Sequence, residues 1–161
     1  MAKATATERV ARDVMQADVL CVGAEMPLTK VTELFVEEGI HGAPVVDETE
    51  AVIGVISTID VLRAVEEEHD APRNDAIYFR ETLEFSGPDW SQAPEDFQDR
   101  LSQITVGEAM QTSVVTVDES TPVREIAKQM RSNRIHRIIV TRNGRVAGIV
   151  TTLDLIALLE G

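Results

Sequence analysis

The sequence contains one cysteine, Cys21, so no internal disulfide can form. Aromatic residues make up only 4% of the chain, and Val, Ile, Leu and Ala therefore have to fill the core. No apolar run approaches the roughly 18 residues that a membrane-spanning helix needs. Residues 1–12 are polar and lack the hydrophobic segment of a signal peptide. We therefore expect a cytoplasmic protein without membrane contact, in which Cys21 is a small buried hydrophobe.

Residues that carry catalysis or bind metals are also scarce. The three histidines, His41, His69 and His136, stand far apart in the sequence. We find no nucleophile motif, no ligands at metal-binding spacing and no glycine-rich phosphate loop. The acidic run 66–70 contains one of the histidines but is typical of a solvated helix end. The sequence therefore predicts neither an enzyme nor a resident metal or cofactor.

Basic residues are outnumbered by acidic ones. The chain has 28 acidic and 15 basic residues and a formal net charge of −13, which argues against nucleic acid as a partner. Residues 1–11 carry +1, residues 12–65 carry −7, residues 66–105 carry −8 and residues 106–161 carry +1. The second half is therefore basic relative to the first, and we expect it to receive an anionic ligand better.

One seven-residue pattern occurs twice, at 54–60 and at 148–154. Each copy is a short apolar strand, then Ser or Thr, then an Asp three residues later in the first turn of an apolar helix. A helix N-terminus has unpaired N–H groups and a partial positive charge, so it suits an anion such as phosphate. The same residues also fit a capping box, in which Ser57 or Thr151 caps the helix and Asp60 or Asp154 reaches back. A purely structural role is therefore the alternative.

The surroundings of the motif are repeated as well. At an offset of 95 residues, both halves carry the same residue at Met15, Val19, Val22, Pro27, Ile40, His41 and Val45. Each half has the order strand, helix, strand, strand, helix. In the first half, strands are predicted at 19–22, 43–46 and 52–56 and helices at 27–38 and 58–65, after a lead-in helix at 8–15. In the second half, strands are predicted at 114–117, 138–140 and 146–150 and helices from residue 122 and at 152–159.

The predicted fold class is therefore α/β (α+β), with two β-α-β-β-α repeats. Asn143-Gly144 predicts a tight hairpin, because both residues tolerate a positive φ. A unit of roughly 50 residues is too small to bury a good core alone. We therefore expect the two repeats to pack face to face about a pseudo-two-fold axis and to leave two equivalent clefts.

Residues 67–104 interrupt the repeats as a helical connector or insert. A weak helical pattern covers 75–85, and a second helix is predicted at 94–104, with Ser91 as a candidate cap. The only tyrosine, Tyr78, and the only tryptophan, Trp90, both lie here. We expect them to pin the insert against a domain or a partner chain.

With these motifs, the sequence resembles a tandem pair of cystathionine-beta-synthase (CBS) domains, also called a Bateman module. The resemblance covers residues 12–66 as the first CBS domain and 105–160 as the second, and leaves out the insert. The motif that carries it is Gly-hydrophobic-x-Ser/Thr-x-x-Asp, which is complete in both halves.

The resemblance implies a binding role for ten residues. Asp60 and Asp154 would bind the ribose hydroxyls of an adenosine ligand, and Ser57 and Thr151 would contact ribose or phosphate. The residues that would hold adenine are Ala43, Pro44 and Ile138. The residues that resemble the phosphate-contacting His-Arg pair in the gamma subunit of AMP-activated protein kinase are His136 and Arg137. The first half has His41 but Gly42 in place of the arginine, so we expect unequal sites, with the better phosphate contacts in the second half.

The function implied by this resemblance is that of a stand-alone, non-catalytic sensor of an adenine nucleotide. AMP is the first candidate ligand, with ATP, ADP and S-adenosylmethionine behind it. Binding in the clefts would shift the two halves, and such modules usually pair into homodimers that signal to a regulated protein, whose identity stays unknown. The alternative is a structural interaction module that binds no ligand, in which the motifs serve only as helix caps.

Overall fold

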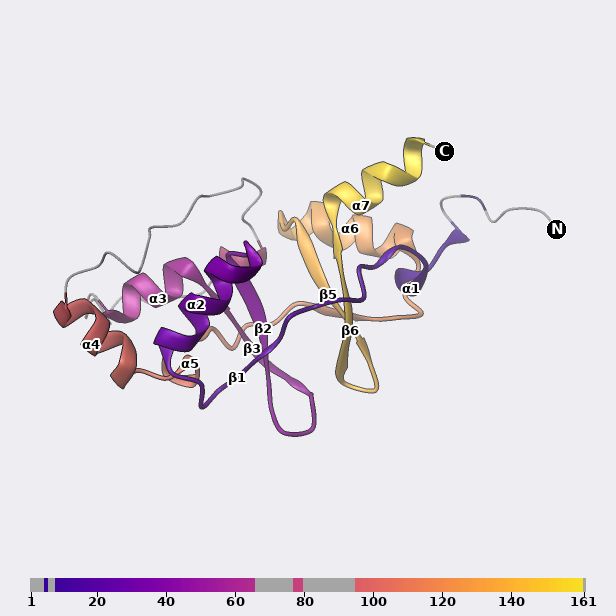
Figure 1. The fold of residues 1–161 in the computed structure, drawn as a ribbon. Coiled ribbons are helices and arrows are strands. Elements are labelled where there is room, and N and C mark those ends of the chain that lie inside the picture. Colours follow the sequence, from indigo (N-terminus) through magenta and orange to yellow (C-terminus); the bar gives the residue numbers. More distant parts are fainter. Residues whose placement is uncertain (1–4, 6–7, 66–76, 80–94, 161) are drawn as a thin grey trace. The chain divides into compact units, whose positions relative to one another are not determined.

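The computed structural model describes residues 5, 8–65, 77–79 and 95–160. They fall into two compact units that do not follow the order of the chain. The first-repeat unit consists of Leu20–Tyr78 and Leu83–Val114, and the second-repeat unit of Met1–Val19, Phe79–Thr82 and Val115–Gly161. Figure 1 shows the helices and strands of both units.

Both units have the same chain topology. The first-repeat unit contains β1 (Val22–Gly23), α2 (Leu28–Glu38), β2 (Gly42–Val46), β3 (Val52–Ser57) and α3 (Thr58–Val65). The second-repeat unit contains β4 (Thr116–Asp118), α6 (Val123–Asn133), β5 (Arg137–Arg142), β6 (Arg145–Thr151), α7 (Thr152–Ala157) and the 3-10 turn η4 (Leu158–Glu160). In each sheet the first strand pairs in parallel with the second, which pairs antiparallel with the third. The predicted α/β (α+β) class and its two repeats are confirmed.

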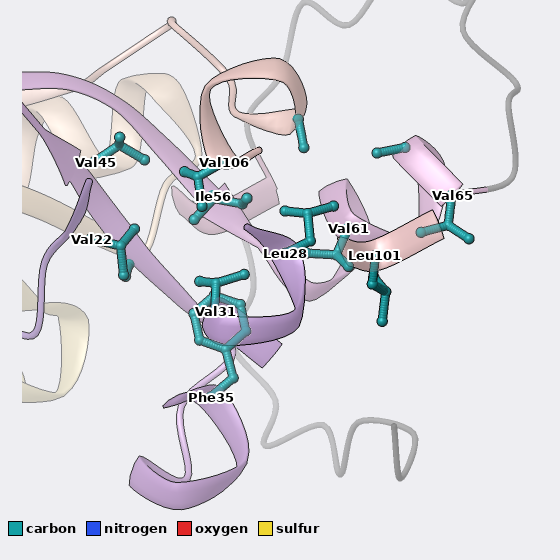
Figure 2. Packing of buried hydrophobic residues seen from close by; sticks show 13 residues of the cluster. Val22, Leu28, Val31, Phe35, Val45, Ile56, Val61, Val65, Leu101 and Val106 are labelled. Atoms are coloured by element: carbon teal, nitrogen blue, oxygen red, sulfur yellow. The ribbon is translucent and has the colours of Figure 1, made fainter. Parts of the chain in front are cut away.

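The core of the first-repeat unit lies between helix α2 and the sheet. Leu28, Val31 and Phe35 recur at helical spacing and are buried. They pack in one cluster with Val45 of β2 and Ile56 of β3 (Figure 2). Because the side chains of this cluster are closely packed, Leu28→Ala should lower the free energy of unfolding by about 2–5 kcal/mol.

The ends of α2 follow from two residues with restricted or unusual backbone angles. Pro27 is the N-cap, with an extended ψ of 150°, so the helix begins one residue later than the sequence predicted. Its missing N–H costs nothing there, because the helix has not yet begun its hydrogen bonds. Gly39 ends the helix with a φ of 64°, in the left-handed region that glycine adopts without steric strain.

The second-repeat unit is built in the same way. Its helix α6 buries Val123, Ile126 and Met130. The hairpin between β5 and β6 turns at Asn143 and Gly144, whose φ values are 54° and 79°. Both are positive, as the predicted tight hairpin requires.

The short helices that lead into the repeats are exchanged between the units. Helix α1 (Ala11–Val14) belongs to the second-repeat unit, and helix α5 (Val106–Ala109) belongs to the first-repeat unit. Equivalent hydrogen bonds hold both exchanged helices. Ala11 N donates to Thr121 O at 2.9 Å, and Val106 N donates to Met26 O at 2.8 Å, between matching positions of the two repeats.

The insert contributes two described elements. Helix α4 (Glu95–Gln103) packs on α2 and α3 in the first-repeat unit, where Leu101 is fully buried and Arg100 Nη1 donates to Val65 O at 2.9 Å. The 3-10 turn η2 (Ile77–Phe79) carries Tyr78, which is also buried. Helix α4 agrees with the predicted helix, whereas Ser91, Trp90 and the run 66–70 lie outside the described residues.

Two predicted strands are shorter or shifted. The strand expected at 19–22 is reduced to Val22–Gly23, and the one expected at 114–117 is observed at Thr116–Asp118. The chain passes from one unit to the other next to both segments, between Val19 and Leu20 and between Val114 and Val115. Each strand therefore begins to pair with its sheet only after the chain has crossed from one unit to the other. Cys21 lies in this stretch and is half-buried rather than part of a buried strand. Every helix that the structure describes is too short or too polar to cross a bilayer.

Candidate functional site

Ser57 and Asp60 form a capping box at the start of α3. Asp60 Oδ2 accepts hydrogen bonds from the backbone N and the Oγ of Ser57, both at 3.0 Å. Ser57 Oγ in turn accepts a bond from Asp60 N at 3.3 Å. Both residues are only 1% exposed. The motif of the first repeat is thus a buried, internally bonded helix start.

Thr151 and Asp154 repeat this geometry at the start of α7. Asp154 Oδ2 accepts from Thr151 N at 2.8 Å and from Thr151 Oγ1 at 3.0 Å, and Thr151 Oγ1 accepts from Asp154 N at 3.3 Å. Both residues are half-buried rather than buried. The capping boxes that the sequence offered as a structural role are therefore formed in both repeats. They occupy one carboxylate oxygen of each Asp and neither require nor exclude a ligand on the other.

The second oxygen of each Asp is held by a glutamine that the sequence reasoning missed. Gln111 Nε2 donates to Asp60 Oδ1 at 3.2 Å, and Gln16 Nε2 donates to Asp154 Oδ1 at 3.1 Å. The signal was present, because both glutamines directly follow the matched methionines Met15 and Met110 at the offset of 95. A carboxylate oxygen has two lone pairs, so a ligand hydroxyl at Oδ1 would share this oxygen with the glutamine or displace it.

The segments that contain Gln16 and Gln111, called the lead-in segments, also explain why each motif begins with a glycine. The backbone of Gln16 pairs with Ile149 in both directions at 2.9 Å, and Gln111 pairs with Val55 at 2.8 and 2.9 Å. A Cβ atom at Gly148 would lie 2.7 Å from Gln16 O, and one at Gly54 would lie 2.7 Å from Gln111 O. Only glycine allows this close backbone approach.

The strand pairing places the predicted phosphate-binding arginine beside the motif. Arg137 at the start of β5 is directly opposite Thr151, and Gly42 at the start of β2 is directly opposite Ser57. Directly opposed residues of an antiparallel pair project from the same face of the sheet. The structure therefore brings Arg137, Thr151 and Asp154 together within the second-repeat unit.

The predicted adenine-contacting residues are buried. The side chains of Ala43 and Ile138 are 1% and 0% exposed, Ala43 belongs to the core cluster of the first-repeat unit, and Pro44 is also buried. His41 and His136 are half-buried just before the strands. Their carbonyl groups accept the first helical N–H groups, from Thr58 and Thr152, at 3.0 Å.

The Cys21 thiol and the possible metal ligands were also considered as functional groups. The pKa of the Cys21 thiol is raised because burial disfavours the thiolate, and the charge of Glu50 adds to this, so this thiol is a poor nucleophile. Among the described residues, no group of three or more His, Cys, Asp or Glu side chains could hold a metal ion.

The repeats identify the family. The family model for the CBS domain matches residues 11–67 and 106–161, and the chain belongs to this family. The structure of the CBS domain of a membrane protein from Sphaerobacter thermophilus is similar with a TM-score of 0.71 and 30% identity, over 94% of this chain and 88% of that one.

Two further structures share the fold at lower identity. CBSX2 in complex with AMP has a TM-score of 0.64 at 22% identity, over 94% of this chain and 97% of that one. The CBS domain pair of protein MJ0100, in complex with 5-methylthioadenosine and S-adenosyl-L-methionine, has a TM-score of 0.62 at 20% identity, over 94% and 96%. Three curated relatives, among them chloroplastic CBSX2 of Arabidopsis thaliana at 28% identity over 74% of this chain, are longer. The chain spans only 39–49% of their length.

Proposed function

We propose that the chain is a non-catalytic regulatory module that binds an adenine nucleotide at the motif of the second-repeat unit. Asp154 binds the ribose hydroxyls, Thr151 contacts ribose or phosphate, and His136 with Arg137 binds the phosphate. The observation that carries this proposal is the placement of Arg137 opposite Thr151 on one face of the sheet, next to a half-buried Asp154. A guanidinium pairs with two phosphate oxygens at once, and a carboxylate accepts hydrogen bonds from a diol.

AMP is the ligand we propose first, followed by ATP and ADP, with S-adenosylmethionine as a further candidate. Family members bind AMP, 5-methylthioadenosine and S-adenosylmethionine in solved complexes, and all three share the adenosine group. The guanidinium of Arg137 favours an anionic phosphate over the uncharged thioether of 5-methylthioadenosine or the positively charged sulfonium of S-adenosylmethionine. Ser57, Asp60, His41, Ala43 and Pro44 are the corresponding residues of the first repeat, where the arginine is missing, so we expect this motif to bind a nucleotide more weakly than the second.

We expect the bound nucleotide to shift the equilibrium between conformations and so to signal to a regulated partner protein. A ligand can do this only if it binds one conformation more tightly than another. We also propose a homodimer as the signalling form. An exposed apolar face supports the homodimer. Helix α7 and turn η4 expose the side chains of Leu153, Ile156 and Leu159, and burying such a face in a dimer is favourable because it removes apolar surface from water.

Calorimetric titration with AMP, ADP, ATP, S-adenosylmethionine and GMP tests the proposal. We expect micromolar binding of one or more adenine nucleotides, an affinity loss of about tenfold or more in Arg137→Ala for the phosphate-bearing ligands, and no binding of GMP. Arg142→Ala is the matched control, because Arg142 lies on the same strand but pairs with Glu119 instead. Absence of heat and of thermal shift with every adenine ligand would reject a sensor role.

That rejection would favour the alternative of a structural interaction module. The capping boxes at Ser57 and Thr151 satisfy the motif residues without a ligand, so this function needs no further site. Its signature would be a stable complex with a partner protein that no nucleotide strengthens or weakens.

A further inference from the structure

The insert residue Tyr78 lies against the motif of the first repeat. If a Cβ atom were added to Gly42, it would lie 2.6 Å from Tyr78 Cδ2 and 3.2 Å from Tyr78 Cε2. The side chain is 2% exposed, although it comes from a segment outside the repeats. The edge of the aromatic ring therefore fills the space that the side chain of residue 42 would otherwise take.

This space has a defined counterpart in the second-repeat unit. Gly42 is opposite Ser57, and Arg137 is opposite Thr151, so the tyrosine ring stands where the other motif has its arginine. The absence of an arginine from the first motif is thus explained by packing. Any side chain larger than hydrogen at position 42 would collide with the ring or with Ile56 O, which lies 2.9 Å from the added Cβ.

The next residue of the insert, Phe79, lies in the second-repeat unit, where the motif residues are more exposed. The side chain of Phe79 is 2% exposed, and its carbonyl group accepts a hydrogen bond from His136 N at 2.7 Å. The side chains of Thr151 and Asp154 in that unit are nevertheless half-buried. Ser57 and Asp60, by contrast, are 1% exposed. Among the residues that the structure describes, only the first motif has both its hydroxyl residue and its aspartate buried.

We infer that Tyr78 is a built-in occupant of the first motif and limits the chain to one nucleotide, bound at the second motif. This inference rests on the proposed function and names its stoichiometry. The ring excludes a ligand from the region next to Ser57 by occupying it. A nucleotide can enter there only when the tyrosine has left, so the first motif binds more weakly by the free energy of displacing a buried ring.

Two measurements on the full-length chain test the inference. The first is the number of AMP molecules bound per chain in calorimetry, which we expect to be one in the wild type and two in Tyr78→Ala. Tyr78→Phe keeps the ring and should stay at one. Asp154→Ala combined with Tyr78→Ala should retain a single site, at the first motif.

The second measurement uses the fact that Tyr78 is the only tyrosine. Incorporation of 3-fluorotyrosine gives one ¹⁹F resonance, and its solvent isotope shift reports whether the ring is in contact with water. We expect a buried ring both without nucleotide and at saturating AMP. This readout needs no substitution and stays decisive if Tyr78→Ala does not fold.

The outcomes separate this inference from the proposed function. Two AMP molecules bound to the wild type, a ring that is exposed at saturation, or a folded Tyr78→Ala that still binds one AMP would each overturn the inference while the sensor function stands. No binding to the wild type but one AMP bound to Tyr78→Ala would reject the second motif as the site and support the occluding role of Tyr78. No binding to either would overturn both.

Discussion

In the first-repeat unit, Ser57 and Asp60 are each 1% exposed, and the ring of Tyr78 stands where a side chain of residue 42 would be. In the second-repeat unit, the matching Thr151 and Asp154 are half-buried, and Arg137 takes that position. The capping hydrogen bonds agree to within 0.2 Å between the two. The comparison teaches that the shared motif builds a helix start, whereas the capacity to bind a ligand depends on which side chains surround it.

A second difference between the units concerns their outer helices. Helix α4 packs on α2 and α3, where Ile59 and Leu62 are half-buried and Val65 is buried. Their counterparts on α7 and η4 are exposed, and no helix in the described part of the second-repeat unit takes the place of α4. The insert therefore covers the first repeat at both its motif and its outer helix.

The largest expected effect is on nucleotide affinity, when the aspartate of the second motif is removed and the aspartate of the first motif is kept. Asp154→Ala should weaken nucleotide binding by about tenfold to 100-fold, since hydrogen bonds to a charged group contribute about 1.5–3 kcal/mol. Asp60→Ala is the matched control, because it removes the equivalent capping box, and we expect its effect on affinity to be less than threefold (about 0.6 kcal/mol). Calorimetry on both variants decides the ranking. Equal losses, or a larger loss at Asp60, would contradict it.

The outer-helix comparison predicts which face associates. Ile156 is 53% exposed on α7, and Val36 is 62% exposed on α2. If the proposed homodimer forms through α7, Ile156→Asp should raise its dissociation constant at least tenfold (about 1.4 kcal/mol), because it places a charge in an apolar contact. Val36→Asp adds the same charge at a similarly exposed position and should leave the dissociation constant unchanged. Sedimentation velocity over a concentration series would show both, and a dimer that survives Ile156→Asp would exclude this face.

The two glutamines should differ in their contribution to stability. Gln111 is 8% exposed and donates to a buried carboxylate, whereas Gln16 is exposed. Gln111→Ala should therefore lower the free energy of unfolding by about 1–3 kcal/mol, and Gln16→Ala by less than about 0.5 kcal/mol. Urea unfolding of both variants provides the measurement. Similar losses would mean that the two lead-in segments contribute equally.

The smallest effect concerns a surface ion pair that only the second repeat has. Arg142 donates to Glu119 at 2.8 and 2.6 Å, and these hydrogen bonds lower the pKa of Glu119. The matching positions of the first repeat hold Ala24 and Asp47. A depressed carboxyl pKa stabilises the fold above the unfolded pKa, about 4.3 for a glutamate, and this contribution is lost as the pH falls through the folded pKa.

Glu119→Gln should therefore lower the Tm near neutral pH, and the difference from the wild type should vanish in acid. High salt should also reduce it, because the pair is at the surface. Thermal melts from pH 3 to pH 7 at two salt concentrations would test this. A difference that grows toward low pH would refute the assignment of the ion pair.

Much of the fold could be predicted because it depends on local patterns. The apolar spacing of Leu28, Val31 and Phe35 identified α2, and Gly39 marked its end. Asn143-Gly144 predicted its hairpin, since the required backbone angles depend on those two residues alone. The repeat offset identified the paired motifs, the motifs indicated the family, and the resemblance to that family implied the role of Arg137. Gln16 and Gln111 followed the same offset and were missed because a glutamine by itself suggests no chemistry.

The amino-acid sequence by itself determined the two repeats, their α/β class and the residues of both motifs, because helix periodicity, strand alternation and capping act over a few residues. Only the tertiary structure decided that each lead-in helix joins the other repeat and that Tyr78 packs on Gly42. Those contacts join segments 36 or more residues apart, and their pairing depends on which surfaces exclude water together rather than on any local preference. The same sequence motif therefore acquires two different surroundings.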